Sequence, residues 1–376
     1  MGDKLLRRWR MGLIGGGPGS FIGAVPRLAA EMDREIELVA GAFSSDAARS
    51  REAGAGYRID PGRAYASWSE MIVREQARAD GMDFVVIATP NHLHLPAALE
   101  ALDAGLAVMS DKPMTATLAE AGALAARAAG AARPYRLTYT YGGYPLVREA
   151  RRLVADGRLG SIRKVVVEYS QGWLARPIEA EGAKQAGWRT DPAQAGAGCI
   201  GDIGVHAFHL AEFVSGRRVA RICADLNTLV AGRRVDDDCN ALLRFDNGAT
   251  GALIASQIAV GERNRLHLRL YGERASLEWR QESPNTLSIR DLDGTETILH
   301  AGTAMGPDAM AATRLPSGHP EGYLEAFANL YRDFARLLGG EDNGLLADAH
   351  EGLRGMAFIH AAQTAGGAWT DLELQA

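Results

Sequence analysis

The sequence predicts an α/β protein with an N-terminal, doubly wound parallel sheet and a C-terminal α/β domain built on a large, open, mostly antiparallel sheet. Three observations lead to this prediction. Short apolar strands alternate with helical stretches in the first third of the chain, longer strands dominate after residue 162, and 376 residues are too many for one ordinary core. We place the boundary at residue 140, which gives the expected domains 1–140 and 141–376.

In the first domain, the expected strands lie at residues 10–14, 36–42, 83–88, 106–109 and 136–140. A helix over 96–102 begins with a proline and ends before Gly105, which are common signals at the two ends of a helix. A further helix is expected over 118–129. Helices that connect successive strands in this way favour a parallel sheet covered on both faces.

In the second domain, strands are expected at residues 164–169, 218–229, 239–245, 249–258, 265–271 and 276–281. Asp246-Asn247-Gly248 lies between two of these strands and predicts a hairpin turn. Residues 283–320 read as irregular, and 321–338 and 348–364 as amphipathic helices. One face of such a sheet is free for helices or for another subunit, so a homodimer or homotetramer is expected.

Composition narrows the class of partner. Lys and Arg number 41 against 46 Asp and Glu, and the net charge of −5 without a basic stripe argues against nucleic acid. Cys199, Cys223 and Cys239 lie too far apart for a CxxC pair, which indicates a reducing compartment. The basic N-terminal segment loses its apolar run at the glycines after residue 14, before a signal peptide or membrane span could form. We therefore expect a cytoplasmic protein with no membrane partner and a small-molecule ligand.

The stretch GGGPGSFIG, residues 15–23, directly follows the first expected strand. A glycine-rich turn from strand to helix lets a pyrophosphate approach the backbone and the N-terminus of the helix, as in dinucleotide-binding Rossmann domains. Two glycines fit the first positions of GxGxxG, a serine takes the third, and the alternative is a flexible loop. The predicted cofactor contacts here are Gly15, Gly17, Gly19, Ser20, Phe21 and Ile22.

The tip of the second expected strand lacks the acid that reads the adenosine ribose of NAD. It carries Ser44, Ser45 and Arg49 instead, and two hydroxyls with a guanidinium suit a 2′-phosphate. NAD or NADP is thus the expected cofactor, with a preference for NADP. In the alternative interpretation, Asp46 merely caps the next helix.

Polar side chains also follow the strand at 83–88. Thr89, Asn91 and His94 lie at the carboxyl edge of the sheet, where ligands of open α/β sheets bind, and are predicted to contact ribose or phosphate. The alternative is a capped turn with His94 at the start of a helix.

Asp111-Lys112-Pro113 follows the next strand and reaches the same edge. Because proline restricts the preceding residue to extended conformations or permits a cis bond, Pro113 fixes the direction of Lys112. We predict that the ammonium of Lys112 is aimed at the nicotinamide and serves in proton transfer, with Asp111 beside it; the alternative is a solvated loop lysine.

A second cluster is Asp202, His206 and His209, four and three residues apart, which share one face if the segment is helical. A carboxylate that orients an imidazole forms an acid/base pair. The spacing could also bind a metal, but the HExxH motif is absent, so no metal is expected. The alternative is a helix start capped by Asp202, with His206 in the core.

Together, GGGPGSFIG, ATPNHLH, DKP and GDIGVHAFH resemble, in this order and over nearly the whole chain, the Gfo/Idh/MocA family of nicotinamide-dependent dehydrogenases of sugars, cyclitols and related polyols. The resemblance implies a Rossmann domain and an α/β domain whose sheet often forms dimer or tetramer contacts. It implies that Lys112 is the catalytic lysine, with Asp111 in place of the family's glutamate. Asp202 and His206 match the D-x-x-x-H motif, with the histidine as acid/base partner, and His209 stands where many relatives carry a substrate-binding Asp or Asn.

The resemblance extends to three further stretches, 171–173, 187–190 and 319–323. It implies that Trp173 and Trp188 stack on a sugar or cyclitol and that Arg189 and His319 bind its hydroxyls, although each residue could equally be core packing. The expected activity is hydride transfer between NAD(P) and a secondary hydroxyl. Two alternatives stay open: a variant that keeps NAD(H) bound and oxidises transiently to support elimination or glycoside cleavage, and a non-catalytic nucleotide-binding sensor.

Overall fold

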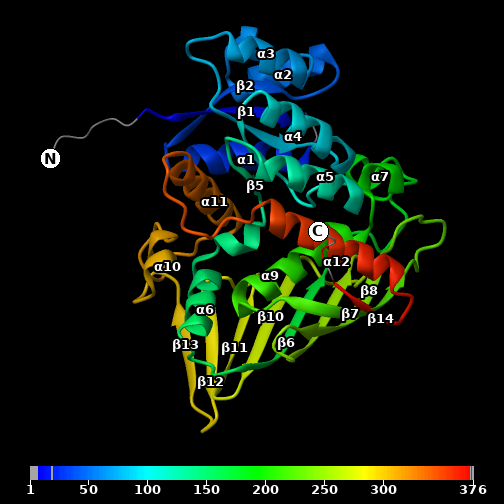
Figure 1. The fold of residues 1–376 in the computed structure, drawn as a ribbon, viewed down its shortest axis with the longest axis vertical. Helices are drawn as coiled ribbons and strands as arrows, with labels where there is room; N and C mark the ends of the chain where they lie inside the picture. The colour runs from blue at the N-terminus through cyan, green and yellow to red at the C-terminus, as the bar shows by residue number, and fades with distance from the viewer. Residues whose placement is uncertain (1–6, 18–19, 373, 375–376) are drawn as a thin grey trace, which may run out of the picture.

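The computed structural model describes residues 7–17, 20–372 and 374, and it places two sheets one above the other with helices between and around them (Figure 1). The first sheet is parallel and has the strand order β2-β1-β3-β4-β5. Its strands are β1 (Trp9–Gly15), β2 (Ile36–Ala42), β3 (Phe84–Ala88), β4 (Ala107–Ser110) and β5 (Tyr135–Leu137). The predicted Rossmann sheet is confirmed.

Helices cover both faces of this sheet, as the alternation of strands and helices predicts. They are α1 (Phe21–Met32), α2 (Ala47–Tyr57), α3 (Trp68–Gln76), α4 (His94–Asp103) and α5 (Leu118–Ala129). On one face, Val85 and Val108 pack with Ala101 and Leu124, and none of these four side chains is exposed. Small alanines let α4 and α5 approach the sheet closely, so the carboxyl ends of β3 and β4 are held firmly in place.

The other face of the parallel sheet is covered by α1 and by α11 (Tyr323–Leu338), a helix from near the end of the chain (Figure 1). Phe84 of β3 meets Phe334 of α11 edge to face, with ring centroids 5.2 Å apart. The second half of the chain therefore contributes to the core of the first sheet. The domain boundary at residue 140 stays a prediction. Helix α11 follows this boundary in the sequence but packs against the sheet that precedes it.

The second sheet has nine strands in the order β13-β12-β11-β10-β6-β9-β8-β7-β14. All its pairs are antiparallel except β6 with β9, which confirms the mostly antiparallel sheet. Its strands are β6 (Ile162–Ser170), β7 (Val219–Asn227), β8 (Asp238–Phe245), β9 (Thr250–Ser256), β10 (Arg265–Gly272), β11 (Ala275–Arg280), β12 (Thr286–Asp291), β13 (Glu296–His300) and β14 (Trp369–Asp371).

Two local predictions for this sheet had different outcomes. The turn Asp246-Asn247-Gly248 joins β8 to β9, and Gly248 has a φ of +84°, so the predicted hairpin is confirmed. The prediction that 283–320 is irregular is wrong for β12, for β13 and for the short helix at Pro307–Ala311. The reason is that β13 is exposed along nearly its whole length and carries no alternation of buried residues that would reveal a strand.

The remaining helices are α6 (Pro145–Ala155), α7 (Lys184–Arg189), α8 (Pro192–Ala195), α9 (Val205–Ser215), α10 (Pro307–Ala311) and α12 (Ala349–Thr364). Of these, α6, α9 and α12 lie on the face of the large sheet that turns toward the first sheet (Figure 1). Every residue of α9 is buried, because the helix is enclosed between the two halves of the molecule. No helix in the described part of the chain combines the length and the apolar character needed to cross a membrane.

Candidate active site

A cleft of about 1260 Å³ lies at the carboxyl edge of the parallel sheet, facing the start of α9. The structure brings most of the predicted site residues together in its walls: Gly15, Gly17, Ser20, Ser44, Ser45, Arg49, Thr89, Asn91, Asp111, Lys112, Trp173, Trp188, Arg189, Asp202 and His206. The strand ends of one half and a helix start of the other thus share one cavity.

Three predicted residues lie outside these walls. Both ring nitrogens of His94 face backbone carbonyls, those of Pro113 at 2.9 Å and Thr89 at 3.0 Å, as in the capped-turn alternative. His209 is buried and stacks on Tyr139 with ring centroids 4.0 Å apart. His319 is exposed, and its ring nitrogen meets the Pro316 carbonyl at 3.2 Å. Gly19 lies outside the described residues, as do the side chains of Phe21 and Ile22.

The glycine-rich turn packs tightly against the neighbouring strands. Gly15 has a φ of +91°, and a Cβ there would lie 2.4 Å from the Ala88 carbonyl oxygen. A Cβ on Gly17 would lie 2.5 Å from the carbonyl oxygen of Phe43. Only glycine satisfies these positions, and the turn delivers backbone N–H groups and the start of α1 to the cleft. The cradle therefore fits a pyrophosphate.

The first acid in the sequence after β2 is Asp46. Asp46 caps α2 by accepting a hydrogen bond from the Arg49 backbone N–H at 2.9 Å, and this bond lowers the pKa of the Asp46 carboxyl. The cap predicted as an alternative is thus present. Ser44, Ser45 and Arg49 line the adjoining end of the cleft.

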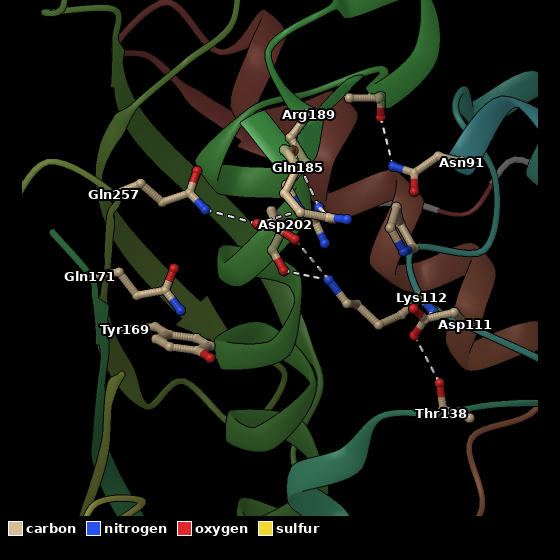
Figure 2. Close-up of polar contacts among 12 residues, drawn as sticks. Asn91, Asp111, Lys112, Thr138, Tyr169, Gln171, Gln185, Arg189, Asp202 and Gln257 are labelled. Carbon is tan, nitrogen blue, oxygen red and sulfur yellow. Dashed lines mark hydrogen bonds and ion pairs between the residues drawn. The ribbon is translucent and has the colours of Figure 1, made fainter. Parts of the chain in front are cut away.

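Asn91 joins the two halves of the molecule at the cleft. Its side-chain amide donates to the Ala195 carbonyl oxygen at 2.8 Å, from the end of β3 to the last residue of α8, and Figure 2 shows this contact. Because Asn91 is buried, the bond is shielded from water and fixes the segment that carries Trp188 and Arg189 next to the cofactor side.

Lys112 reaches across the cleft from the end of β4. Its Nζ donates to the Asp202 carbonyl oxygen at 2.5 Å and lies 3.3 Å from Asp202 Oδ1 (Figure 2). The Lys112–Pro113 peptide is cis. Asp111 Oδ1 accepts from the Lys112 backbone N–H at 2.9 Å and from Thr138 Oγ1 at 2.9 Å. Asp111 thus braces the loop, and its side chain is not aimed at Lys112 Nζ.

Asp202 lies in a π-helical turn, Ile200–Gly204, directly before α9. Its Oδ2 accepts from Gln257 Nε2 at 2.8 Å and lies 3.5 Å from Arg189 Nε. Burial raises the pKa of the Asp202 carboxyl, but the charges of Lys112 and Arg189 and the Gln257 hydrogen bond outweigh burial, so the pKa lies well below its ordinary value. The carboxylate is therefore ionised and held from three sides.

His206 occupies an aromatic pocket beside this carboxylate. Its ring lies edge-on to Tyr139 and Tyr141, with centroids 5.8 and 4.9 Å away, and its Nδ1 is buried without a hydrogen-bond partner. Burial lowers the pKa of His206 well below its ordinary value, the Lys112 charge lowers it further, and Asp202 opposes both. The imidazole is neutral.

The sequence predicts that Asp202 orients His206, but the hydrogen bonds of the Asp202 carboxylate among the described residues go to Lys112 and Gln257. The π-helical turn accounts for the difference. It inserts an extra residue into the turn between the two side chains, so they no longer have the spacing of an ordinary helix. The structure therefore pairs the carboxylate with the lysine.

Sequence reasoning missed three polar residues of the cleft walls, Tyr141, Tyr169 and Asn264, and also Gln257, which donates to Asp202. Tyr169 lies at the end of β6, and Asn264 directly precedes β10, so both occupy strand ends on the cleft side. Position at a strand end was the available signal, because no motif marks them. Among the described residues, no three His, Cys, Asp or Glu side chains gather in a way that could hold a metal ion.

Comparison with known proteins identifies the family. Residues 9–139 match the oxidoreductase family model with an NAD-binding Rossmann fold, and residues 147–278 match the GFO/IDH/MocA C-terminal domain. An uncharacterized oxidoreductase of Bacillus subtilis, YfiI, is 31% identical over 94% of this chain and 92% of its own. The chain belongs to the GFO/IDH/MocA family of NAD-binding oxidoreductases, which confirms the resemblance.

Solved structures similar to this chain support the same family assignment. An inositol dehydrogenase homolog from Azotobacter vinelandii, complexed with NAD⁺, is 36% identical over 97% of both chains, with a TM-score of 0.93. Its complex with NADH and myo-inositol superimposes with a TM-score of 0.89, at 34% identity over 97% of this chain and 98% of that one. Levoglucosan dehydrogenase from Pseudarthrobacter phenanthrenivorans is 28% identical over 54% of this chain and 57% of its own.

Proposed function

We propose that the protein is an NAD(P)-dependent dehydrogenase that transfers a hydride between the nicotinamide and a secondary hydroxyl of a sugar, cyclitol or related cyclic polyol. One observation carries the proposal: Lys112 from the parallel sheet meets Asp202 at the start of α9, with His206 beside them, in the cleft that also holds the glycine-rich turn. The myo-inositol complex of the Azotobacter vinelandii homolog supports the substrate class. Trp173 and Trp188 in the cleft walls offer faces for a sugar or cyclitol ring.

The chain's own residues supply the proton chemistry. Gly15, Gly17 and Ser20 would hold the dinucleotide, which when bound would supply the hydride acceptor for the carbinol carbon. The Lys112 ammonium, held by Asp202, stabilises the alkoxide that develops as the hydride leaves. His206 lines the cleft and is neutral, so its imidazole can accept the hydroxyl proton. The Asp202 carboxylate offsets the positive charge of Lys112 and of the imidazolium that forms.

For the cofactor, we propose a preference for NADP. The support is local: Asp46, the acid nearest the tip of β2, is engaged as a helix cap, while Ser44, Ser45 and Arg49 line the adjoining end of the cleft. Two hydroxyls and a guanidinium favour a 2′-phosphate over a bare ribose hydroxyl. NAD use remains compatible with the family.

We also infer a homodimer or homotetramer that associates through the large sheet. The face of this sheet turned away from α9 carries apolar side chains that are partly open to solvent, among them Leu242 at 53% and Ile298 at 52% exposure. Light scattering coupled to size exclusion should give a mass of two or four chains, and a monomer at micromolar concentration would contradict the inference. The expected cytoplasmic location stays a prediction.

The experiment for the activity is a substrate panel. Purified protein is mixed with cyclitols including myo-inositol, with hexoses, pentoses and anhydrosugars, and with NAD⁺ or NADP⁺, while the absorbance of reduced cofactor is followed. Reduction with at least one cyclic polyol is expected. A protein that binds NADH but oxidises none of the panel would contradict the dehydrogenase. Cofactor that co-purifies and turns over without external supply would instead favour transient oxidation.

A further inference from the structure

Three side chains form a continuous polar surface of the cleft next to His206, and we call Tyr141, Tyr169 and Asn264 the tyrosine wall. The rings of Tyr141 and Tyr169 lie 4.9 and 6.3 Å from the His206 ring, centroid to centroid, and all three residues of the wall line the cleft. A substrate whose reacting hydroxyl meets His206 therefore presents its neighbouring ring positions to this wall.

The direction of each hydrogen bond in the wall follows from Trp173. An indole N–H is only a donor, and Trp173 Nε1 lies 3.0 Å from the side-chain oxygen of Gln171. This contact orients the Gln171 amide, so its Nε2 donates to Asn264 Oδ1 at 2.7 Å. The Asn264 amide is thereby oriented too, and its Nδ2 points to Tyr141 Oη at 3.4 Å.

Both phenol hydroxyl hydrogens are donated to other members of the tyrosine wall. Because Asn264 Oδ1 can only accept, Tyr169 donates its hydrogen to this oxygen at 2.7 Å. The short contact between the hydroxyls of Tyr141 and Tyr169 must then use the hydrogen of Tyr141. Asn264 Oδ1 has two donors, and each phenol oxygen keeps one lone pair. Burial raises the pKa of both phenols, so they are neutral.

We propose that the tyrosine wall determines substrate specificity by accepting hydrogen bonds from free hydroxyl groups next to the reacting carbon. This inference rests on the proposed function. A hydroxyl can donate to the remaining lone pair of Tyr141 or Tyr169. An ether, carbonyl or carboxylate oxygen at the same ring position has no hydrogen to donate. It would place one acceptor next to another, and because both tyrosines are only 3% exposed, water could not satisfy them. The wall therefore selects polyols with an unmodified hydroxyl vicinal to the one that reacts.

The test compares a polyol with its own methyl ethers. For the panel polyol that turns over best, kcat/KM is measured for the parent and for each mono-O-methyl ether, in the wild type and in Tyr141→Phe, Tyr169→Phe and Asn264→Leu. Tyr271→Phe, on a partly exposed strand residue away from the cleft, is the matched control. NADH affinity by fluorescence titration checks that the cofactor side is intact in every variant.

In the wild type, the ether at one position vicinal to the reacting carbon should be used about tenfold to a hundredfold less well than the parent. In Tyr169→Phe or Tyr141→Phe this ratio should fall toward one, because the parent loses its partner while the ether does not, and Tyr271→Phe should keep the wild-type ratio. Equal use of all ethers by the wild type, or a ratio unchanged in both wall variants with NADH affinity intact, would overturn the proposal.

Failure of the proposed function is a separate outcome. If no panel compound reduces the cofactor, calorimetric titration of the NADH complex with myo-inositol, D-glucose and D-glucuronate still tests the wall. The structure requires tighter binding of at least one neutral polyol to the wild type than to Tyr169→Phe. Equal affinities in the two proteins, or no binding of either neutral polyol to the wild type, would overturn the inference without reference to activity.

Discussion

Lys112 and Asp202, ninety residues apart, meet at the centre of the cleft, where Lys112 Nζ lies 3.3 Å from Asp202 Oδ1. Only 11% of the lysine side chain and 23% of the aspartate side chain are exposed, so the pair is shielded from solvent more than a surface ion pair is. Asp202 is also held by Gln257 and Arg189, and the ammonium thus has a fixed direction before any substrate arrives.

Replacing the Asp202 carboxylate should reduce the catalytic effect of Lys112 without weakening cofactor binding. In Asp202→Asn, the charge that pairs with Lys112 and Arg189 is lost, and we expect kcat to fall by about 100-fold or more, as when a preorganised charge stabiliser is removed. NADH affinity should change little. Steady-state kinetics and NADH titration measure both, with Asp225→Asn on the exposed part of β7 as the control. An unaffected kcat in Asp202→Asn would contradict the role of the pair.

The buried histidines should make stability depend on pH. Burial and the charges of Arg151 and Arg218 lower the pKa of His209 to about 3, from 6.5. Between pH 6.5 and 3, His209 is therefore protonated in the unfolded state but not in the folded state. Its contribution to the free energy of unfolding is complete above pH 6.5 and declines as pH falls below this value. The slope is about 1.4 kcal/mol per pH unit for one group.

His209→Phe keeps an aromatic ring against Tyr139 but does not titrate. Its free energy of unfolding should fall less steeply than that of the wild type between pH 6.5 and 4.5, by the slope of one group. Urea unfolding at several pH values measures this difference. Parallel curves for the two proteins would show that His209 is not buried in the neutral form.

The glycine-rich turn should tolerate no Cβ at its first position. In Gly15→Ala, the added carbon would meet the Ala88 carbonyl at 2.4 Å with a φ of +91°, so the end of β1 must move and NADH binding should weaken at least tenfold. Gly56→Ala in α2 has nothing within 4 Å of the new carbon and should leave binding unchanged. Fluorescence titration with NADH distinguishes the two; equal affinities would mean that the turn does not hold the cofactor.

Arg49 tests the cofactor preference. If its guanidinium meets a 2′-phosphate, Arg49→Ala should raise the KM for NADP⁺ about tenfold or more and leave the KM for NAD⁺ nearly unchanged. The neighbouring Arg51, also exposed on α2, supplies the control Arg51→Ala. A wild type that prefers NAD⁺, or an equal loss with both cofactors, would contradict the assignment.

Much of the fold follows from local signals. The strand at 36–42 and the helix at 118–129 match β2 and α5 at both ends, because alternation and helix signals agree there. Thr117 begins α5 with a capping box that includes Glu120, which is visible in the sequence. Strand β13 was missed because nearly all of it is exposed, so its sequence lacks the alternation of apolar and polar residues that marks a half-buried strand.

Some features of the candidate site could also be predicted from the sequence, and others could not. Lys112 and Asp202 lie in recognisable motifs, and the structure brings them together. Their pairing with each other could not be read from the sequence, because it depends on the packing of α9 against the parallel half and on the π-helical turn. Tyr141 and Asn264 belong to no motif; their meeting depends on long-range strand pairing. Predicted roles in substrate and cofactor contact stay predictions for all these residues.

The central claim is that the Lys112 ammonium acts on the reacting hydroxyl and not on cofactor binding. The most direct measurement is the single-turnover rate of hydride transfer in Lys112→Ala, together with its NADH dissociation constant. Lys164→Ala, at an exposed position of β6, is the matched control. We predict a hydride-transfer rate at least about 100-fold lower, with NADH affinity retained. A Lys112→Ala protein that transfers hydride at the rate of the wild type would contradict the account.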